Sequence, residues 1–182
     1  MTTSSTPDAD VQAFVALRNR VTRFCFEYRA CKDLFFHSPE REKLLNRCAG
    51  PLFAIILDAL VDQLLLQLAV VGDPPRAKND PKQTNLSLQF MLELAESRAT
   101  PSQARDTARL KRSIEQFRKD LQPIGKHRSK RIAHADAVTV LDPAHALPKV
   151  VREQLDHLST DLFAIVNDLA PFFGEADFAF DQ

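Results

Sequence analysis

The sequence predicts an all-α fold, a single up-and-down bundle of about five helices, and three observations support it. The chain has 182 residues, 45% of them hydrophobic, which is enough for one domain with a buried core. It has only four glycines, so few left-handed turns are available. Prolines mark the ends of long segments in which apolar residues recur at intervals of three and four, the spacing of one helix face.

The first helix is predicted to run from Asp8 or Asp10, either of which can cap it, to about His37. Its apolar face consists of Val11, Phe14, Val15, Val21, Phe24, Cys25, Tyr28, Cys31, Leu34 and Phe35. The proline of Ser38-Pro39 opens a second helix, which Gly50-Pro51 should kink or split.

Residues 52–71 form the most apolar run, interrupted by Asp58 and Asp62. Each of these carboxylates would cost roughly 2.5–3.5 kcal/mol at the centre of a bilayer, so we expect a buried bundle helix and no membrane span. One broad apolar arc contains Leu57, Leu60, Val61, Leu64, Leu65 and Leu68. The two aspartates share another arc, either as a polar seam or as paired carboxylates for acid-base work.

A polar loop is expected over residues 76–84, with Asp73 as the stop of the preceding helix and Asn85 as the cap of a short helix to Ser97. Thr100-Pro101 then starts a helix whose buried stripe is Leu110, Ile114, Phe117 and Leu121. Pro123 should bend or restart that helix.

The last helix is predicted from about Pro148 to Phe173, and Gly174 closes it. Its inward residues are Val151, Leu155, Leu158, Leu162, Ile165, Val166 and Leu169. We expect residues 1–7 to be disordered, residues 8–174 to form the helical domain, and residues 175–182 to form an acidic tail.

Other sequence features bound the compartment and the chemistry. Residues 2–7 lack the basic and apolar regions of a secretory signal, so a cytoplasmic protein is expected. Cys25, Cys31 and Cys48 are odd in number and lack a CxxC spacing, which predicts reduced core thiols. No HxxxH, HExxH, GxGxxG, GxxxxGK or GxSxG occurs, so we predict neither a metal site nor a cofactor.

The segment 126–136 is the chemically most informative part of the chain. From Arg105 to Arg131 there are ten lysines and arginines against three acids, although the whole chain has a net charge of zero. This local excess favours a phosphate-bearing partner, and the alternative is a solvated helix end. Arginine matches phosphate with a fixed fork of donors, and histidine moves a proton near neutral pH.

The spacing of the candidate residues constrains how they can act. His127, Arg131 and His134 would share one face of a helix, and Arg128 would lie on another. Arg128 and His134 would be separated by about 120° and about 9 Å along a straight helix. They can converge on one phosphate only if the helix breaks between them or a second subunit contributes.

Four patches resemble a known family in their order and spacing. They are Leu60-Val61-Asp62-Gln63 through Leu68, Gly72-Asp73-Pro74-Pro75, Asn85-Leu86-Ser87-Leu88, and Arg131-Ile132-Ala133-His134-Ala135-Asp136. Together with Arg128-x5-His134 they resemble the AbiU-type abortive-infection branch of the HEPN (higher eukaryote and prokaryote nucleotide-binding) domains.

The resemblance implies a homodimeric helical bundle and, in active members, a metal-independent ribonuclease. Arg128 would neutralise the scissile phosphate and His134 would take the proton from the RNA 2′-OH. His127, Lys130, Arg131 and Asp136 would contact the substrate. Active members often carry Asn, Asp or His after the arginine, where this chain has Ser129, and regulated members carry a tyrosine at the position of Asp136.

Three functions are therefore compatible with the sequence. The leading one is an RNA-cleaving toxin or phage-defence effector, with an antitoxin protein as a further partner. The second is a non-catalytic module that binds a nucleotide, RNA or an acidic partner through the same basic face. The third is a purely structural helical dimer.

Overall fold

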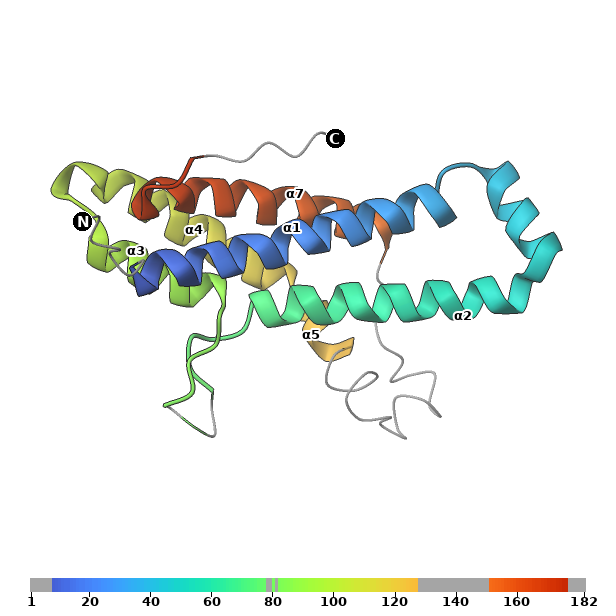
Figure 1. Cartoon of the computed structure of the whole chain (residues 1–182), viewed down its shortest axis with the longest axis horizontal. Coiled ribbons are helices and arrows are strands. Elements are labelled where there is room, and N and C mark those ends of the chain that lie inside the picture. Colours follow the sequence, from blue (N-terminus) through green and yellow to red (C-terminus); the bar gives the residue numbers. More distant parts are fainter. Residues whose placement is uncertain (1–7, 78–79, 81, 128–150, 177–182) are drawn as a thin grey trace, which may run out of the picture. The chain divides into compact units, whose positions relative to one another are not determined.

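The computed structural model describes residues 8–77, 80, 82–127 and 151–176. Regular structure within these ranges is helical, and the all-α prediction is confirmed (Figure 1). The elements are α1 (Ala9–Phe35), α2 (Pro39–Val71), α3 (Leu88–Arg98), η1 (Pro101–Gln103), α4 (Ala104–Asp120), α5 (Gln122–His127), α7 (Arg152–Leu169) and η4 (Ala170–Phe173).

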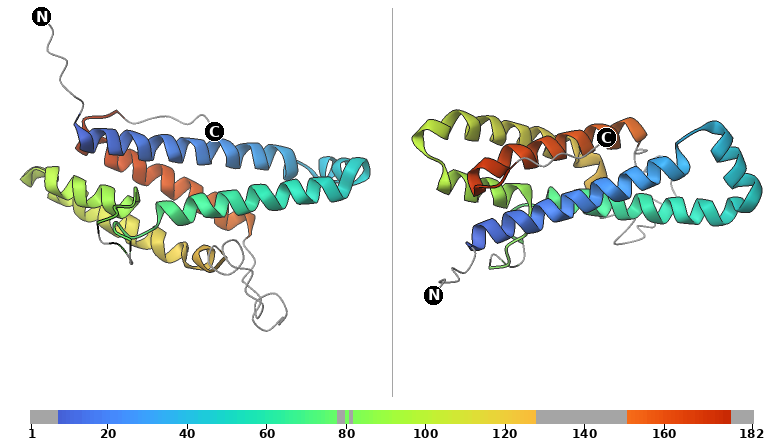
Figure 2. Two further views of the ribbon diagram at one scale, coloured as in Figure 1. Left: turned by 60° about the horizontal axis from the view of Figure 1, so that its bottom comes forward. Right: turned by 45° about the horizontal axis from the view of Figure 1, so that its top comes forward.

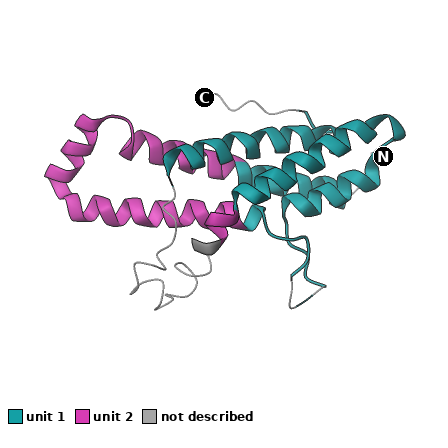
Figure 3. Cartoon of the chain, turned by 180° about the vertical axis from the view of Figure 1, so that it is seen from behind, with its two compact units in different colours: residues 1–21, 70–121, 151–182 teal, residues 22–69, 122–150 magenta. Residues whose placement is uncertain are grey.

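The described residues fall into two compact units (Figure 3). The first unit contains the start of α1 as far as Val21, residues 70–121 with α3 and α4, and the chain from Val151 with α7 and η4. The second contains α1 from Thr22 onward, α2 as far as Ala69, and α5.

In the first unit, α3, α4 and α7 pack against one another and η4 packs on α3 and α7 (Figure 2). The stripe predicted for α4 is confirmed, because Leu110, Ile114, Phe117 and Leu121 are all buried. The start of α1 joins this core through Phe14, whose ring stacks on that of Phe173 with 4.8 Å between centroids. Each large apolar side chain buried in this way contributes roughly 1.5–3 kcal/mol to stability.

Polar contacts close the ends of the first unit. Arg98, the last residue of α3, hydrogen bonds to the carboxylate of Asp8 and donates to the carbonyl of Phe172 at 3.0 Å. Gly174 adopts a left-handed conformation with φ 70°, as expected of the residue that ends the last helix. Arg18 pairs with Glu175 at 2.7 Å, so the beginning of the tail docks on α1.

In the second unit, α1 and α2 form an antiparallel helical hairpin. The rings of Phe35 and Phe53 meet edge to face near the turn, and Gln67 hydrogen bonds to Glu27 farther along. The predicted break in α2 is confirmed, because Ala49 has non-helical dihedral angles directly before Gly50-Pro51. Proline lacks the N–H of a helical hydrogen bond, and its ring clashes with the carbonyl four residues earlier, here that of Arg47, so the helix cannot continue straight.

The expectation that α2 is buried along its length is wrong. Leu64, Leu65, Leu68 and Ala69 at its C-terminal end are buried, and Asp62 is half-buried, whereas Ile55 is 67% exposed. Of the described helices, α2 alone is long and apolar enough by length and composition to cross a membrane, and only 28% of its most apolar stretch is buried. The apolar composition of α2 therefore does not show which parts of the helix are buried.

Several local expectations are also corrected. Ser87, not Asn85, caps α3, because the Ser87 hydroxyl accepts a hydrogen bond from the N–H of Phe90. Asn85 instead closes the polar loop, where its side-chain amide donates to the carbonyl of Pro74 at 2.9 Å. Val151 is exposed just before α7, because it lies outside the helix whose inward face it was expected to join. Cys48 is exposed, whereas Cys25 and Cys31 are buried as expected.

Candidate functional site

Most of the predicted site lies outside the described residues. Arg128, Lys130, Arg131, His134 and Asp136 belong to the range 128–150, of which the structure gives no account. His127 is the last residue of α5, and its side chain is likewise outside what is described. The structure therefore defines the helices that lead into and out of the motif.

Helix α4 carries the first half of the basic segment. Its buried stripe faces the core, so its charged residues are left on the opposite, solvated side. The exposed cations are Arg105, Arg109, Lys111, Arg112 and Lys119. The exposed acids Asp106 and Glu115 lie on the same helix and Arg109 pairs with Asp168, so cations outnumber acids on α4 by a smaller margin than this list alone indicates.

A short connection joins α4 to the motif. Leu121 ends α4, with its N–H bonded to the carbonyl of Phe117 at 3.0 Å, and α5 then begins at Gln122. The predicted restart at Pro123 is thus confirmed. Ile124 is fully buried, which anchors α5, and α5 ends at His127, the residue directly before Arg128.

Helices α4 and α7 are tied together within the first unit, and α5 and residues 128–150 lie between them in sequence. Arg109 on α4 pairs with Asp168 on α7 at 3.0 Å. The side-chain amide of Gln154 on α7 donates to the main-chain carbonyl of Asp120 at 3.4 Å. Helices α4 and α7 therefore form one packed pair in the first unit.

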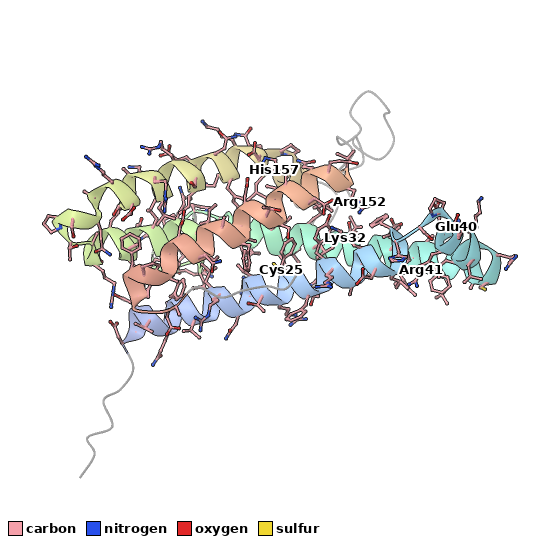
Figure 4. The ribbon with its side chains drawn as sticks, turned by 90° about the horizontal axis from the view of Figure 1, so that it is seen from above. Cys25, Lys32, Glu40, Arg41, Arg152 and His157 are labelled. Atoms are coloured by element: carbon pink, nitrogen blue, oxygen red, sulfur yellow. The ribbon has the colours of Figure 1, made fainter. Side chains whose placement is uncertain are left out.

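One polar cluster between α4 and α7 was not anticipated from the sequence. One ligand-type atom each from Asp120, His157 and Asp161 lies within 4.8 Å of the others. His157 Nδ1 is 2.9 Å from Asp161 Oδ2, and His157 projects from α7 (Figure 4). The only signal in the sequence was the spacing His157-x3-Asp161, which places both side chains on one helix face.

The aspartates on α2 remain compatible with both interpretations, a polar seam and a pair of carboxylates for acid-base work. Asp58 is exposed and Asp62 is half-buried one turn later, and each makes an interaction. Asp73 follows the end of α2, and its N–H bonds to the carbonyl of Val70 at 3.3 Å, as expected of a helix stop.

An all-α bundle with an Arg-x5-His motif on the chain between two packed helices has the features of a HEPN-type domain. The family model HEPN_AbiU2, described as AbiU2, matches residues 11–181, and the chain belongs to this family. No curated protein and no solved structure gives a significant match.

Proposed function

We propose that this chain is a metal-independent endoribonuclease that acts as a toxin or phage-defence effector. The observation that carries the proposal is the family match over residues 11–181, which includes both Arg128 and His134. The resemblance seen in the sequence assigns the phosphate-binding and proton-transfer roles to these two residues.

The chemistry follows from the two side chains. A neutral imidazole at His134 accepts the proton of the RNA 2′-OH, and the 2′-oxygen attacks the adjacent phosphorus. The bond from phosphorus to the 5′-oxygen breaks as the new bond forms, which leaves a 2′,3′-cyclic phosphate. The departing 5′-oxygen takes a proton from the imidazolium or from water and leaves as a hydroxyl. The guanidinium of Arg128 neutralises charge that develops on the phosphate oxygens. General acid-base help of this kind supplies roughly 10²–10⁴-fold in rate. The exposed cations of α4 support the proposal, because RNA must approach along a positive surface.

The proposed active form is a homodimer. Arg128 and His134 do not converge on one straight helix, so a second subunit can complete the cleft. Phe26, Leu52 and Ile55 are large apolar side chains that remain more than half exposed, and a second copy of the chain would cover such surface. An antitoxin protein is proposed as a further partner.

A non-catalytic binding module is the second candidate function. Ser129 favours it, because active members often have Asn, Asp or His at this position to orient the site. The module would use His127, Lys130, Arg131 and Asp136 to hold a nucleotide, RNA or an acidic partner without cleaving it.

The two candidates are separated by incubating purified protein with RNA and with DNA, each with and without EDTA. The nuclease should cut RNA, spare DNA, leave 2′,3′-cyclic phosphate ends and keep its activity in EDTA, because the nucleophile is the 2′-OH. His134→Ala should lower cleavage at least about 10²-fold with RNA binding nearly intact. Arg128→Ala should weaken both cleavage and binding, because its fork contacts the phosphate before and during the reaction.

Two matched variants serve as controls. His37→Ala and Arg152→Ala each remove an exposed histidine or arginine outside the motif, and both should leave cleavage unchanged. If the wild-type protein binds RNA but leaves it uncut over hours, the nuclease proposal is wrong and the binding module is supported. Cleavage that persists in His134→Ala would mean that another residue is the base.

A further inference from the structure

The cluster of Asp120, His157 and Asp161 combines the donor types that divalent transition metals prefer. Imidazole nitrogen and carboxylate oxygen together suit zinc and manganese, whereas magnesium prefers oxygen alone. His157 and Asp161 share one face of α7, and Asp120 is the last residue of α4, so the donors come from two packed helices.

The distances in the cluster are close to those of a coordination sphere. Metal bonds of roughly 2.1 Å separate neighbouring donors by roughly 3.0–3.4 Å. The 2.9 Å between His157 Nδ1 and Asp161 Oδ2 nearly matches this, and no pair of the three donor atoms is more than 4.8 Å apart. The longest separation, up to 4.8 Å, must shorten by about 1.4 Å for one ion to reach all three donors, and His157, whose side chain is 65% exposed, has room to move.

A hydrogen-bond donor orients Asp120, and the other two residues of the cluster line a cleft. Gln116 donates to both carboxylate oxygens of Asp120 at 3.1 Å, and such outer hydrogen bonds hold a ligand in place. Gln116, His157 and Asp161 line a cleft of about 430 Å³ between α4 and α7. Arg112 and Asp168 also line this cleft. The carboxylate of Asp168 is paired with Arg109, so we do not count it among the metal ligands.

We propose that Asp120, His157 and Asp161 form a binding site for one divalent transition-metal ion, with Zn²⁺ preferred over Mg²⁺. His157 binds through Nδ1, so the proton that Nδ1 would share with Asp161 moves to Nε2 or to solvent. The three protein donors leave the remaining coordination position to water. The proposed ion is separate from the proposed cleavage chemistry and is not needed for it.

The ion would join α4 to α7, the two packed helices that carry the cluster. Asp120 lies eight residues before Arg128 in sequence, with α5 between them, and His157 lies in the second turn of α7. An ion bound by both helices fixes α4 relative to α7. It binds the folded state only, because the unfolded chain does not bring Asp120 near His157, so it should raise the melting temperature.

The experiment is calorimetric titration of the full-length Cys48→Ser protein with ZnCl₂ and, separately, with MgCl₂. The Cys48→Ser background removes the exposed thiol, which could bind zinc elsewhere. We expect one Zn²⁺ per chain, much weaker Mg²⁺ binding, and a zinc-dependent rise in melting temperature. His157→Ala and Asp161→Asn should weaken zinc at least about 100-fold, and Gln116→Ala about 10- to 100-fold.

Asp168→Asn is the matched control, because it removes a carboxylate that lines the same cleft but lies outside the cluster, and it should bind zinc as the parent does. Zinc that fails to bind, or that binds Asp161→Asn and Asp168→Asn equally, would overturn the proposal. His134→Ala should bind zinc as the parent protein does. The zinc titration and the cleavage assay therefore test the two proposals independently. If EDTA abolishes cleavage by Asp161→Asn as well as by the parent protein, cleavage needs a metal bound elsewhere. That result would contradict the metal-independent nuclease and would leave the proposed zinc site untouched.

Discussion

At the scale of single residues, burial separates the three cysteines into two kinds. Cys31 is 1% exposed, and burial raises the pKa of its thiol, so little of the reactive thiolate is present near neutral pH. Cys25 is also buried, whereas Cys48 is exposed on the first segment of α2. The sequence predicted one environment for all three, because an odd number of cysteines without a CxxC spacing does not separate a buried thiol from an exposed one.

Labelling of the folded protein with a thiol reagent should therefore show one fast thiol per chain. Cys48→Ser should remove the fast phase, and Cys25 and Cys31 should react at least about tenfold more slowly. The reagent's absorbance against time measures both phases, and denaturant should make all three thiols fast. Equal rates for the three cysteines in the folded protein would contradict the packing of α1.

At the scale of elements, Arg98 joins three segments that are far apart in sequence. Its guanidinium pairs with Asp8 and Asp10 at the start of α1, donates to the carbonyl of Phe172 in η4 and lies 5.6 Å from the centroid of the Phe173 ring. The hydrogen bond from Arg98 lowers the pKa of Asp8 and raises that of Arg98. Arg98 thus connects the end of α3 to the start of α1 and to η4.

Arg98→Met should lower the melting temperature, and the difference from wild type should depend on pH. A carboxyl whose folded pKa is lowered stabilises the fold above its unfolded pKa, about 3.9, and this contribution is lost as the pH falls through the folded value. The difference should be largest above about pH 5 and smaller in acid, where the bond to Phe172 remains.

The control for this series is Arg105→Met, which removes an exposed cation from α4 and should change the melting temperature little at any pH. Scanning calorimetry from acid to neutral pH gives the comparison. A difference that grows as the pH falls would refute the assignment of Asp8 as the main partner.

At the scale of the whole molecule, exposed apolar side chains are unevenly distributed. Among the described residues, the large exposed ones are Phe26, Leu44, Leu52, Ile55 and Val151, and all but Val151 lie in the second unit. Soluble monomers rarely expose extended apolar patches, so this concentration supports the proposed homodimer.

We expect the protein to run as a dimer in light scattering at micromolar concentration, and Ile55→Asp to shift it toward monomer. A buried, unpaired carboxylate at an interface costs several kcal/mol, which is enough to shift an equilibrium by orders of magnitude. Val151→Asp introduces the same charge at an exposed apolar position of the other unit and should leave the dimer intact. A wild-type monomer at this concentration would count heavily against the proposed shared cleft.

The sequence determined most helix positions and the break in α2, because these depend mainly on neighbours in sequence. The stripe of Leu110, Ile114 and Phe117 has the helical period whatever packs against it, and Gly50-Pro51 breaks α2 for steric reasons alone. The candidate nuclease residues Arg128 and His134 were likewise found from spacing and resemblance, and the described structure adds the helices on either side of them.

Tertiary structure decided which apolar surfaces are covered and which distant side chains meet. The sequence of α2 is equally apolar at Ile55 and at Leu64, yet only Leu64 is buried, because burial depends on the neighbours that the fold supplies. His157 and Asp161 share a face by helical spacing, but Asp120 joins them only through the packing of α4 on α7. Periodicity within one helix carries no information about such a contact, since the contact is a property of two helices.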